Sequence, residues 1–468
     1  MDFRTALTTD DVLGENLMPT HSTSGNSLLD LFFSMGASRQ LSSANLELLF
    51  QKAFNVDPLL ATKAIFYNRD IRGGQGERRS FRLFFRYIAE HYPEIAIKNL
   101  HNVVKYGRWD DILIGLGTPI EDDVLDYILY SLKNGDRLCA KWMPREGKRL
   151  NPIAKFLMKK FELTPRNYRK LLAGNTKVVE TLMCRKEWNN INYEHVPSVA
   201  MHKYHKAFYR NDEERFSQFL SAVEKGEKKI HASAIFPHDV IRPYLQKYTR
   251  LDRTIEEQWK ALPDYMPKGL NILPVCDVSG SMTFEGGLPI LVCVALGIYM
   301  AERNEGRFHN IFMTFSRIPH LQYITGNNLR EKVRTVENAE WETNTDLEAM
   351  FRLILDQAVK YNLPESEMPN TLLILSDMQF DRCVRSPSDD AFLMIRRMYE
   401  QAGYKLPQVV FWNLRDSIGV PAKFNQQGVG LVSGFSPSIL KSIFNGDIDP
   451  MKVLLRTLNS ERYESVIV

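Results

Sequence analysis

Hydrophobic residues recur at helical spacing along residues 27–259. In residues 92–107, for example, Ala96, Leu100 and Val103 fall on one helical face. The same pattern predicts further helices at residues 43–55, 57–69, 77–91, 121–133, 151–161, 165–173, 175–186, 198–210 and 212–225. Many short helices in succession predict stacked helical hairpins, that is, an α-solenoid that could close into a ring.

The pattern changes after residues 261–268, where two prolines in ALPDYMPK indicate a linker. Short apolar, β-rich runs follow, separated by helical segments at residues 289–302, 346–359 and 391–401. The expected strands are Asn271–Cys276, Ile311–Phe315, Thr371–Leu375 and Gln408–Trp412. This alternation predicts a Rossmann-like parallel sheet with helices on both faces.

We therefore expect a polar tail at residues 1–26, an α-helical repeat domain at 27–260, a linker at 261–268 and an α/β domain at 269–468. The formal net charge is only +4. However, residues 1–267 carry 40 Lys and Arg against 33 Asp and Glu, whereas residues 268–468 carry 20 against 23. The helical part is thus the one expected to attract polyanions.

The five cysteines are scattered and contain no CxxC pair, so we expect free thiols rather than a disulfide framework or a zinc site. The first residues are polar and acidic, unlike a secretory signal. The longest apolar run, Leu288–Ala301, is short for a bilayer and contains Pro289. These features favour a soluble cytoplasmic protein without a membrane partner.

The most specific chemical motif directly follows the first expected strand and contains Asp277, Ser279 and Ser281. A second carboxylate, Asp377, follows a later strand, and Thr345 stands in a loop between them. The carboxyl ends of parallel strands meet at the edge where open α/β sheets bind ligands. Oxygen donors of this kind suit Mg²⁺. The other interpretation is a plain helix cap formed by Asp277 and its serines.

This constellation resembles the metal-ion-dependent adhesion site of von Willebrand factor A (vWA) domains. The resemblance spans residues 268–468. It implies that Ser279, Ser281 and Thr345 ligate the ion, with Thr343 as the other candidate threonine. It further implies that Asp277 and Asp377 bind directly or through water, and that a partner's carboxylate fills an open coordination position.

Three basic stretches stand out in the helical part. The first, residues 68–79, has glycines before an expected helix start, an arrangement that could hold a phosphate. Its cations are Arg69, Arg72, Arg78 and Arg79. The alternative is a turn between two helices whose arginines are solvated or paired with Asp70 and Glu77.

The second stretch, residues 141–149, interleaves Trp142 with cations, as single-stranded nucleic acid requires. Its cations are Lys141, Arg145, Lys148 and Arg149. A solvated loop with Trp142 in the core is the rival interpretation. The third stretch, which includes Arg169 and Lys170, is a basic helical face or simply solvated surface.

A helical-repeat half joined to a vWA-like half resembles the TROVE arrangement of the Ro autoantigen proteins. The whole chain is similar to a TROVE-like group of plants and large DNA viruses. The segments that carry this resemblance are RDIRGGQGERR (69–79), KYGRWDDIL (105–113), KWMPRE (141–146), YRKLL (168–172), FPHDVI (236–241), SDMQFD (376–381), VFWNLR (410–415) and GLVSGFSPS (430–438). The resemblance implies HEAT-like repeats that form a ring and bind small structured RNAs or single-stranded RNA ends.

We therefore expect a non-enzymatic, Ro-like RNA-binding scaffold with a Mg²⁺-dependent partner site. The alternative is a protein-assembly factor that captures an acidic partner residue through the metal site, without nucleic acid. The chain contains neither a GxxxxGK[ST] loop nor HExxH, so nucleotide hydrolysis and zinc proteolysis have no support in the sequence. A hydrolase with a single acidic metal site is the weakest interpretation.

Overall fold

A computed structural model describes residues 11–13, 19–39, 41–245, 250–315, 318–339, 346–378, 391–415 and 419–468. The chain divides into two compact units. The helical unit comprises Pro58–Ala234 and Glu461–Val468, and the sheet unit comprises Met1–Asp57 and Ile235–Ser460. The chain therefore passes between the units three times, after residues 57, 234 and 460.

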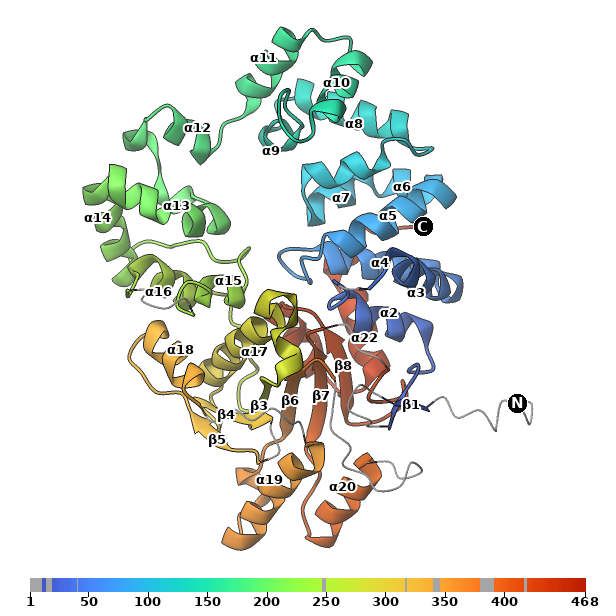
Figure 1. Cartoon of the computed structure of the whole chain (residues 1–468), viewed down its shortest axis with the longest axis vertical. Coiled ribbons are helices and arrows are strands. Elements are labelled where there is room, and N and C mark those ends of the chain that lie inside the picture. Colours follow the sequence, from blue (N-terminus) through green and yellow to red (C-terminus); the bar gives the residue numbers. More distant parts are fainter. Residues whose placement is uncertain are drawn as a thin grey trace. The chain divides into compact units, whose positions relative to one another are not determined.

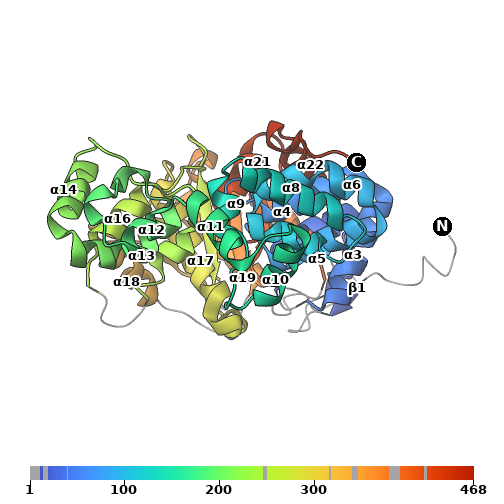
Figure 2. The ribbon, with the colours of Figure 1, turned by 90° about the horizontal axis from the view of Figure 1, so that it is seen from above.

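The helical unit consists of short helices that follow one another closely (Figure 1). They are α4 (Pro58–Arg69), α5 (Arg79–His91), α6 (Pro93–Lys98), α7 (Leu100–Tyr106), η1 (Trp109–Gly115), α8 (Glu121–Lys133), α9 (Arg137–Trp142), α10 (Asn151–Lys160), α11 (Pro165–Asn175), α12 (Val179–Cys184), η2 (Trp188–Asn190), η3 (Tyr193–His195), α13 (Ser198–Asn211), α14 (Glu213–Glu224) and η7 (Glu461–Tyr463). Figure 2 shows α8, α9 and α11 beside one another, and these helices are in mutual contact. The expected succession of short packed helices is confirmed.

Local sequence explains where these helices begin and which face they bury. In α5, Phe81, Phe84, Phe85 and Ile88 recur at helical spacing and are fully buried.

The helix expected across residues 92–107 is instead two helices that meet at Asn99. Asn99 has φ −104° and ψ 8°, and its side-chain amide donates to the Ile95 carbonyl at 2.8 Å. This local hydrogen bond competes with helix continuation and explains the break.

The sheet unit contains a sheet in the order β5-β4-β3-β6-β7-β8. Its strands are β3 (Ile272–Asp277), β4 (Ile311–Phe315), β5 (Leu321–Tyr323), β6 (Thr371–Ser376), β7 (Gln408–Asn413) and β8 (Val429–Ser433). All neighbours pair in parallel except β5, which is antiparallel to β4 at the edge. Every residue of β3 and β6 is buried, as expected for strands covered on both faces. The predicted α/β architecture is confirmed.

Helices cover this sheet, with α17 against β3, β4 and β6, and with α2 and α22 against β8 (Figure 1). The helices of the unit are α2 (Ser27–Met35), α3 (Ser43–Val56), α15 (Pro237–Ile241), α16 (Arg253–Lys260), η4 (Gly280–Thr283), α17 (Phe284–Arg303), α18 (Leu329–Glu337), α19 (Leu347–Tyr361), η5 (Glu365–Glu367), α20 (Ala391–Gln401), η6 (Pro437–Ile439), α21 (Leu440–Phe444) and α22 (Pro450–Leu458). A separate hairpin pairs β1 (Asp11–Leu13) with β2 (Pro19–His21).

Within the described residues, α17 is the one helix long and apolar enough to cross a membrane. However, 67% of its stretch from Gly286 to Arg303 is buried, as in a core helix.

The units do not follow the division expected at residues 261–268. Helices α2 and α3 belong to the sheet unit because α2 packs on β8, where Ser433 Oγ donates to the Phe32 carbonyl at 3.0 Å. Helix α16 belongs there as well, since the Trp259 indole donates to Glu302 on α17 at 2.6 Å. The expected linker packs on α17, where Tyr299 donates to the Pro263 carbonyl.

Candidate functional site

Two strands bring acidic and hydroxyl side chains together at the carboxyl edge of the sheet. Strand β3 ends at Asp277 and the neighbouring strand β6 ends at Ser376, with Cys276 opposite Leu375 in the register. The Ser376 hydroxyl donates to Asp277 Oδ2 at 2.6 Å, and both side chains are fully buried. The edge predicted from the sequence thus contains both strand ends, together with Ser376, which the sequence argument did not include in the site.

The loop after β3 turns back toward the Asp277 carboxylate. The Ser279 backbone N–H donates to Asp277 Oδ1 at 2.8 Å, which fixes the first turn of the loop. The hydroxyls of Ser279 and Ser281 lie 3.0 Å apart. Two hydroxyl oxygens therefore lie together in the loop that begins at a buried carboxylate.

Asp377 forms an ion pair with an arginine that the sequence argument missed. Arg415 Nη1 lies 3.3 Å from Asp377 Oδ2, and the side chains are 15% and 0% exposed, respectively. The same nitrogen lies 3.4 Å from the Ser281 carbonyl oxygen, so Arg415 joins the two loops of the edge. Arg415 ends the segment VFWNLR, which carried the family resemblance without a role assigned to it.

The carboxylates of this edge are crowded and poorly solvated. Burial, together with the negative charge of Asp377, raises the pKa of Asp277 to about 7, although hydrogen bonds from Ser376 and Ser279 act in the opposite direction. A cation near the two carboxylates would favour their ionised forms, and Arg415 supplies one positive charge. Carboxylate and hydroxyl oxygens of this kind fit Mg²⁺ or a similar hard divalent cation.

The expected threonine ligand, Thr345, and its alternative, Thr343, lie outside the described residues. The next residue, Asp346, caps α19 by accepting the Ala349 backbone N–H at 2.9 Å, so the helix start expected there is confirmed. In the part of the chain that the structure describes, no group of three or more His, Cys, Asp or Glu side chains could hold a metal ion. This absence does not apply to a metal site built mainly from Ser and Thr hydroxyl groups, because it concerns only His, Cys, Asp and Glu side chains.

The basic residues of the helical unit fall into two groups, beginning with those engaged inside the fold. Arg69 is 2% exposed and its Nη2 lies 2.8 Å from Asp111 Oδ2, which argues against a contact with RNA. Lys141 forms a half-exposed ion pair with Glu180 at 3.0 Å. Arg145 donates to Thr176 Oγ1 at 3.0 Å.

The second group is exposed to solvent. It comprises Arg72, Arg78, Arg79, Lys148, Arg149, Arg169 and Lys170. Arg169 forms a weak, exposed ion pair with Glu146 at 3.4 Å. These seven side chains are the sequence-predicted cations that lie at the surface of the helical unit.

Trp142 is half-buried rather than enclosed in the core, and a cation stacks on its ring. The Arg108 guanidinium carbon lies 3.9 Å from the ring centroid. Arg108 also pairs with Asp110 at 2.7 Å. The sequence argument missed Arg108 because the chain alone does not reveal that residues 108 and 142 meet.

Three consecutive amides of the glycine-rich loop after α4 are engaged by backbone carbonyls. The amides of Gly74 and Gly76 donate to the Asp70 carbonyl, each at 3.1 Å, and that of Gln75 donates to the Tyr67 carbonyl at 3.1 Å. A Cβ atom at Gly74 would lie only 1.9 Å from the Tyr67 carbonyl oxygen. This glycine is therefore required for close backbone packing within the turn that joins α4 to α5.

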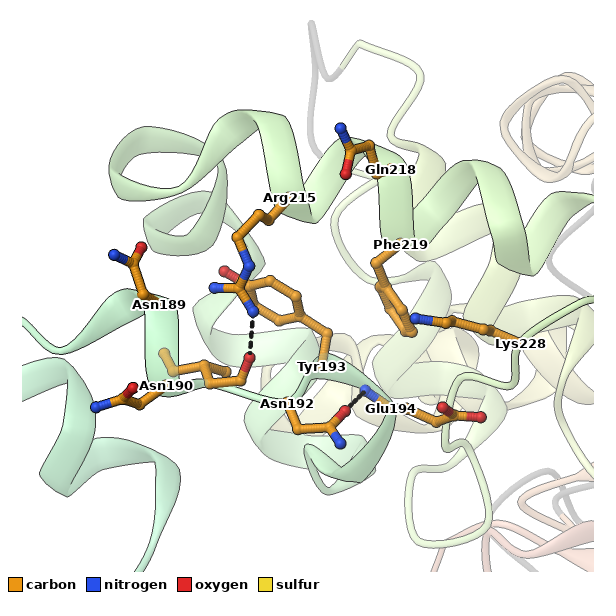
Figure 3. A pocket seen from close by; sticks show the side chains of 10 residues that line it. Asn189, Asn190, Asn192, Tyr193, Glu194, Arg215, Gln218, Phe219 and Lys228 are labelled. Carbon is orange, nitrogen blue, oxygen red and sulfur yellow. Dashed lines mark hydrogen bonds between the residues drawn. The ribbon is translucent and has the colours of Figure 1, made fainter.

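A polar hollow of about 440 Å³ lies in the helical unit between η2, η3 and α14 (Figure 3). Its lining includes Asn189, Asn190, Asn192, Gln218 and Lys228. Arg215 borders it but is committed to the fold, since it donates to the Ile191 carbonyl at 2.9 Å and to Asp212 at 2.7 Å. The sequence argument did not predict this hollow.

The four described cysteines, Cys139, Cys184, Cys276 and Cys293, are free thiols, as expected. The fifth, Cys383, lies outside the described residues.

Comparison with known proteins gives two family models and one curated relative. Residues 14–127 and 154–268 match a domain of unknown function (DUF2828), and residues 271–462 match a second one (DUF7788). The uncharacterized protein L728 of Acanthamoeba polyphaga mimivirus is 32% identical to this chain in an alignment 504 residues long. The alignment covers 95% of this chain and 86% of the viral protein. The chain belongs to the same family as this viral protein. In this chain the two matched domains meet near residue 270.

Among solved structures, the Ro (RSR) protein of Deinococcus radiodurans aligns with 93% of this chain and 99% of its own, at 14% identity and a TM-score of 0.47.

Proposed function

We propose that the chain is a non-enzymatic RNA-binding scaffold of the Ro ribonucleoprotein type. The observation that carries the proposal is a group of arginines at the starts of α5 and η1, namely Arg78, Arg82 and Arg108. Burial and the positive charges of Arg108 and Arg82 lower the pKa of Arg78, although Asp110 and Asp111 act against this. Although it is partly desolvated by its neighbours, the Arg78 side chain still reaches solvent. A polyanion that contacts this group would relieve the repulsion.

The neighbouring aromatic residue favours nucleic acid over other polyanions. Trp142 is half-buried and its ring is stacked with Arg108, which lies 3.9 Å from the ring centroid. An arginine–tryptophan stack presents a planar surface and positive charge together, the combination used to hold unpaired bases. We therefore expect single-stranded RNA or the single-stranded end of a structured RNA as the ligand.

The test is binding of a fluorescent single-stranded RNA by the full chain at several salt concentrations. Replacing Arg72 and Arg78 with glutamate should weaken binding about tenfold or more. The plot of the logarithm of the binding constant against the logarithm of the salt concentration should become less steep, by roughly one unit of slope for each of the one to two phosphate contacts that are lost. The matched control, Arg334→Glu with Lys360→Glu, reverses two exposed charges of the sheet unit and should leave the affinity unchanged. Equal losses in both variants would overturn the proposal.

A second function is favoured by the sheet edge, namely divalent-cation-dependent capture of a partner's carboxylate. The residues that would hold the ion are Asp277, Ser279, Ser281 and Asp377, together with Thr345. When bound, Mg²⁺ would supply a positive charge that a partner's carboxylate can ligate. The supporting observation is a pair of fully buried carboxylates beside two hydroxyls that lie 3.0 Å apart.

Titration with Mn²⁺, followed by electron paramagnetic resonance, tests this second function without knowledge of the partner. The wild-type chain should bind one ion, and Asp277→Ala should bind none while keeping its circular dichroism spectrum. Asp447→Ala serves as the control because Asp447 is an exposed carboxylate, 81% accessible, in the same unit. If the wild type fails to bind Mn²⁺, the cation-dependent function is wrong and the RNA proposal is unaffected.

A further inference from the structure

Residues 461–468 belong to the helical unit, although they follow the whole sheet unit in the sequence, and η7 contacts α4. We propose that α4, the loop after it and α7 form a peptide-binding groove that is selective for a segment with an Arg-Tyr pair in a single helical turn. The occupant in this structure is the chain's own segment 461–468. The inference rests on other contacts than the proposed RNA and metal sites, although Arg72 of the RNA test lies in the same loop.

A buried carboxylate recognises the Arg-Tyr pair. Asp70 is fully buried, and its Oδ1 accepts a hydrogen bond from Arg462 Nη2 at 2.7 Å. Its Oδ2 accepts from Arg462 Nε and, at 3.0 Å, from the Tyr463 hydroxyl. Because a buried carboxylate without such partners is costly, this position strongly favours a planar cation followed by a phenol.

The glycine-rich loop shapes the groove around the guanidinium group. A Cβ atom at Gly73 would lie 2.5 Å from Arg462 Nε, so any larger residue would displace the arginine. The tight loop beyond it also holds Asp70 in place, since the amides of Gly74 and Gly76 donate to the Asp70 carbonyl. The motif of residues 69–79 thus acquires a role, which is to position an acid and make room for an arginine.

Two asparagines bind the backbone of the segment. The Asn102 amide donates to the Ser465 carbonyl at 2.8 Å, and its Oδ1 accepts the Ser465 hydroxyl at 2.8 Å. The Asn99 amide donates to the Ile467 carbonyl at 2.6 Å, and its Oδ1 accepts the Ile467 backbone N–H at 3.3 Å. The side-chain amides at the start of α7 therefore bind the backbone of the segment at two alternate positions, Ser465 and Ile467.

Aromatic contacts complete the recognition. The Tyr463 ring lies 6.0 Å from Tyr67, edge-on, and 5.4 Å from Tyr106, measured between centroids. Tyr106 also donates to the Arg462 carbonyl, and Val466 is buried nearby in the segment. Backbone bonds supply affinity and the side-chain pockets supply selectivity, which are the two components of a peptide-recognition site.

The experiment measures whether the groove binds the same segment when it is supplied in trans. A fluorescein-labelled peptide with the sequence of residues 459–468 is titrated into two full-length proteins. One is the wild type, and the other is the loosened variant Arg462→Ala with Tyr463→Ala, whose own segment lacks the anchors. Fluorescence anisotropy should show the peptide binding the loosened variant at least about tenfold more tightly than the wild type.

Two matched controls identify the groove as the site of binding. Adding Asn102→Ala to the loosened variant should weaken peptide binding about tenfold, and a peptide with alanine in place of both anchors should not bind. Equal binding to the wild type and to every variant would overturn the proposal.

Hydrogen exchange on single variants covers the case in which the loosened variant fails to fold. The Ile467 amide should be protected in the wild type and should exchange at least about tenfold faster in Asn99→Ala, because Asn99 is its acceptor. Exchange at the rate of an unstructured peptide in the wild type would equally overturn the proposal.

Discussion

Arg69 and Asp111 form a buried ion pair that joins α4 to η1. Arg69 Nε donates to Asp111 Oδ2 at 2.8 Å, and the two side chains are 2% and 0% exposed. Asp111 also accepts from Arg82 Nε at 2.7 Å and from the Arg108 backbone N–H at 2.9 Å. One carboxylate therefore organises three arginines of the helical unit.

The first prediction concerns this carboxylate. Asp111→Asn should lower the free energy of unfolding of the helical unit by about 3–5 kcal/mol, because it leaves a buried guanidinium without its counter-charge. Urea denaturation followed by circular dichroism measures the change. As a control, Glu90→Gln removes the exposed Arg86–Glu90 pair, whose side chains are 42% and 40% exposed, and should cost under about 0.5 kcal/mol. Similar losses for the two substitutions would contradict the prediction.

The second prediction compares two glycines of the helical unit. Gly74→Ala should destabilise the unit by roughly 3 kcal/mol, because the new Cβ would meet the Tyr67 carbonyl oxygen at 1.9 Å. Gly174→Ala should stabilise it by about 0.5–1 kcal/mol, because Gly174 lies within α11 and nothing lies within 4 Å of its Cβ position. Thermal denaturation of both variants tests the opposite signs, and a shared sign would refute the argument.

The third prediction is a pH dependence from His238, a buried residue of the sheet unit. Burial lowers the pKa of His238 to about 4, and the positive charges of Arg39 and Arg242 act in the same direction, against Asp239. The folded state therefore keeps the imidazole neutral, so stability is lost as the pH falls from about 6.5 toward 4. The cost should be about 2 kcal/mol at pH 5 relative to pH 7.5.

His238→Phe provides the comparison, because the ring lies between Phe236 and Phe435, with centroids at 5.7 and 5.5 Å. Thermal midpoints measured between pH 5 and 7.5 should fall less steeply for the variant than for the wild type. If the thermal midpoints of the wild type and of the variant fall equally with pH, His238 does not contribute to the pH dependence and the prediction is wrong.

The fourth prediction concerns Arg415 at the sheet edge. Arg415→Ala leaves the buried carboxylates of Asp277 and Asp377 without the guanidinium that lies 3.3 Å from Asp377. The variant should be less stable in EDTA than the wild type. At one fixed Mg²⁺ concentration it should also gain more thermal stability than the wild type, since a protein gains about 2.7 kcal/mol at 100 times its own dissociation constant and a tighter-binding variant reaches that ratio at a lower concentration. If Mg²⁺ raises the thermal stability of both proteins equally, Arg415 does not interact with the cation site and the prediction is wrong.

Much of the fold follows from local sequence patterns. The apolar runs at 311–315 and 371–375 lie within β4 and β6, and the pattern at 121–133 matches α8, since burial on a repeating face leaves a periodic signal. The edge strand β5 is exposed on both outer residues, Leu321 and Tyr323, so it lacks that signal.

In the candidate sites, too, some residues could be predicted from the neighbouring sequence, whereas others meet only in the folded chain. Asp277 and Asp377 were predictable because each follows a strand whose carboxyl end must reach the same sheet edge. Their partner Arg415, and the partners of Asp70 at residues 462 and 463, depend on contacts between distant segments. No spacing rule encodes such pairs, so a single sequence does not reveal them.

The packing of α2 on β8 has a consequence for how the protein is made. The Gly36 backbone N–H donates to Ser433 Oγ at 3.2 Å across 397 residues of chain. At roughly 5–20 residues per second, the ribosome needs about 20–80 s to synthesise that stretch. Throughout this interval the apolar face of α2, which includes Leu29, Leu31 and Phe32, has no strand to cover it. Among the described elements that α2 contacts most, that helix therefore has only α3 to pack against until β8, the last strand, has been synthesised.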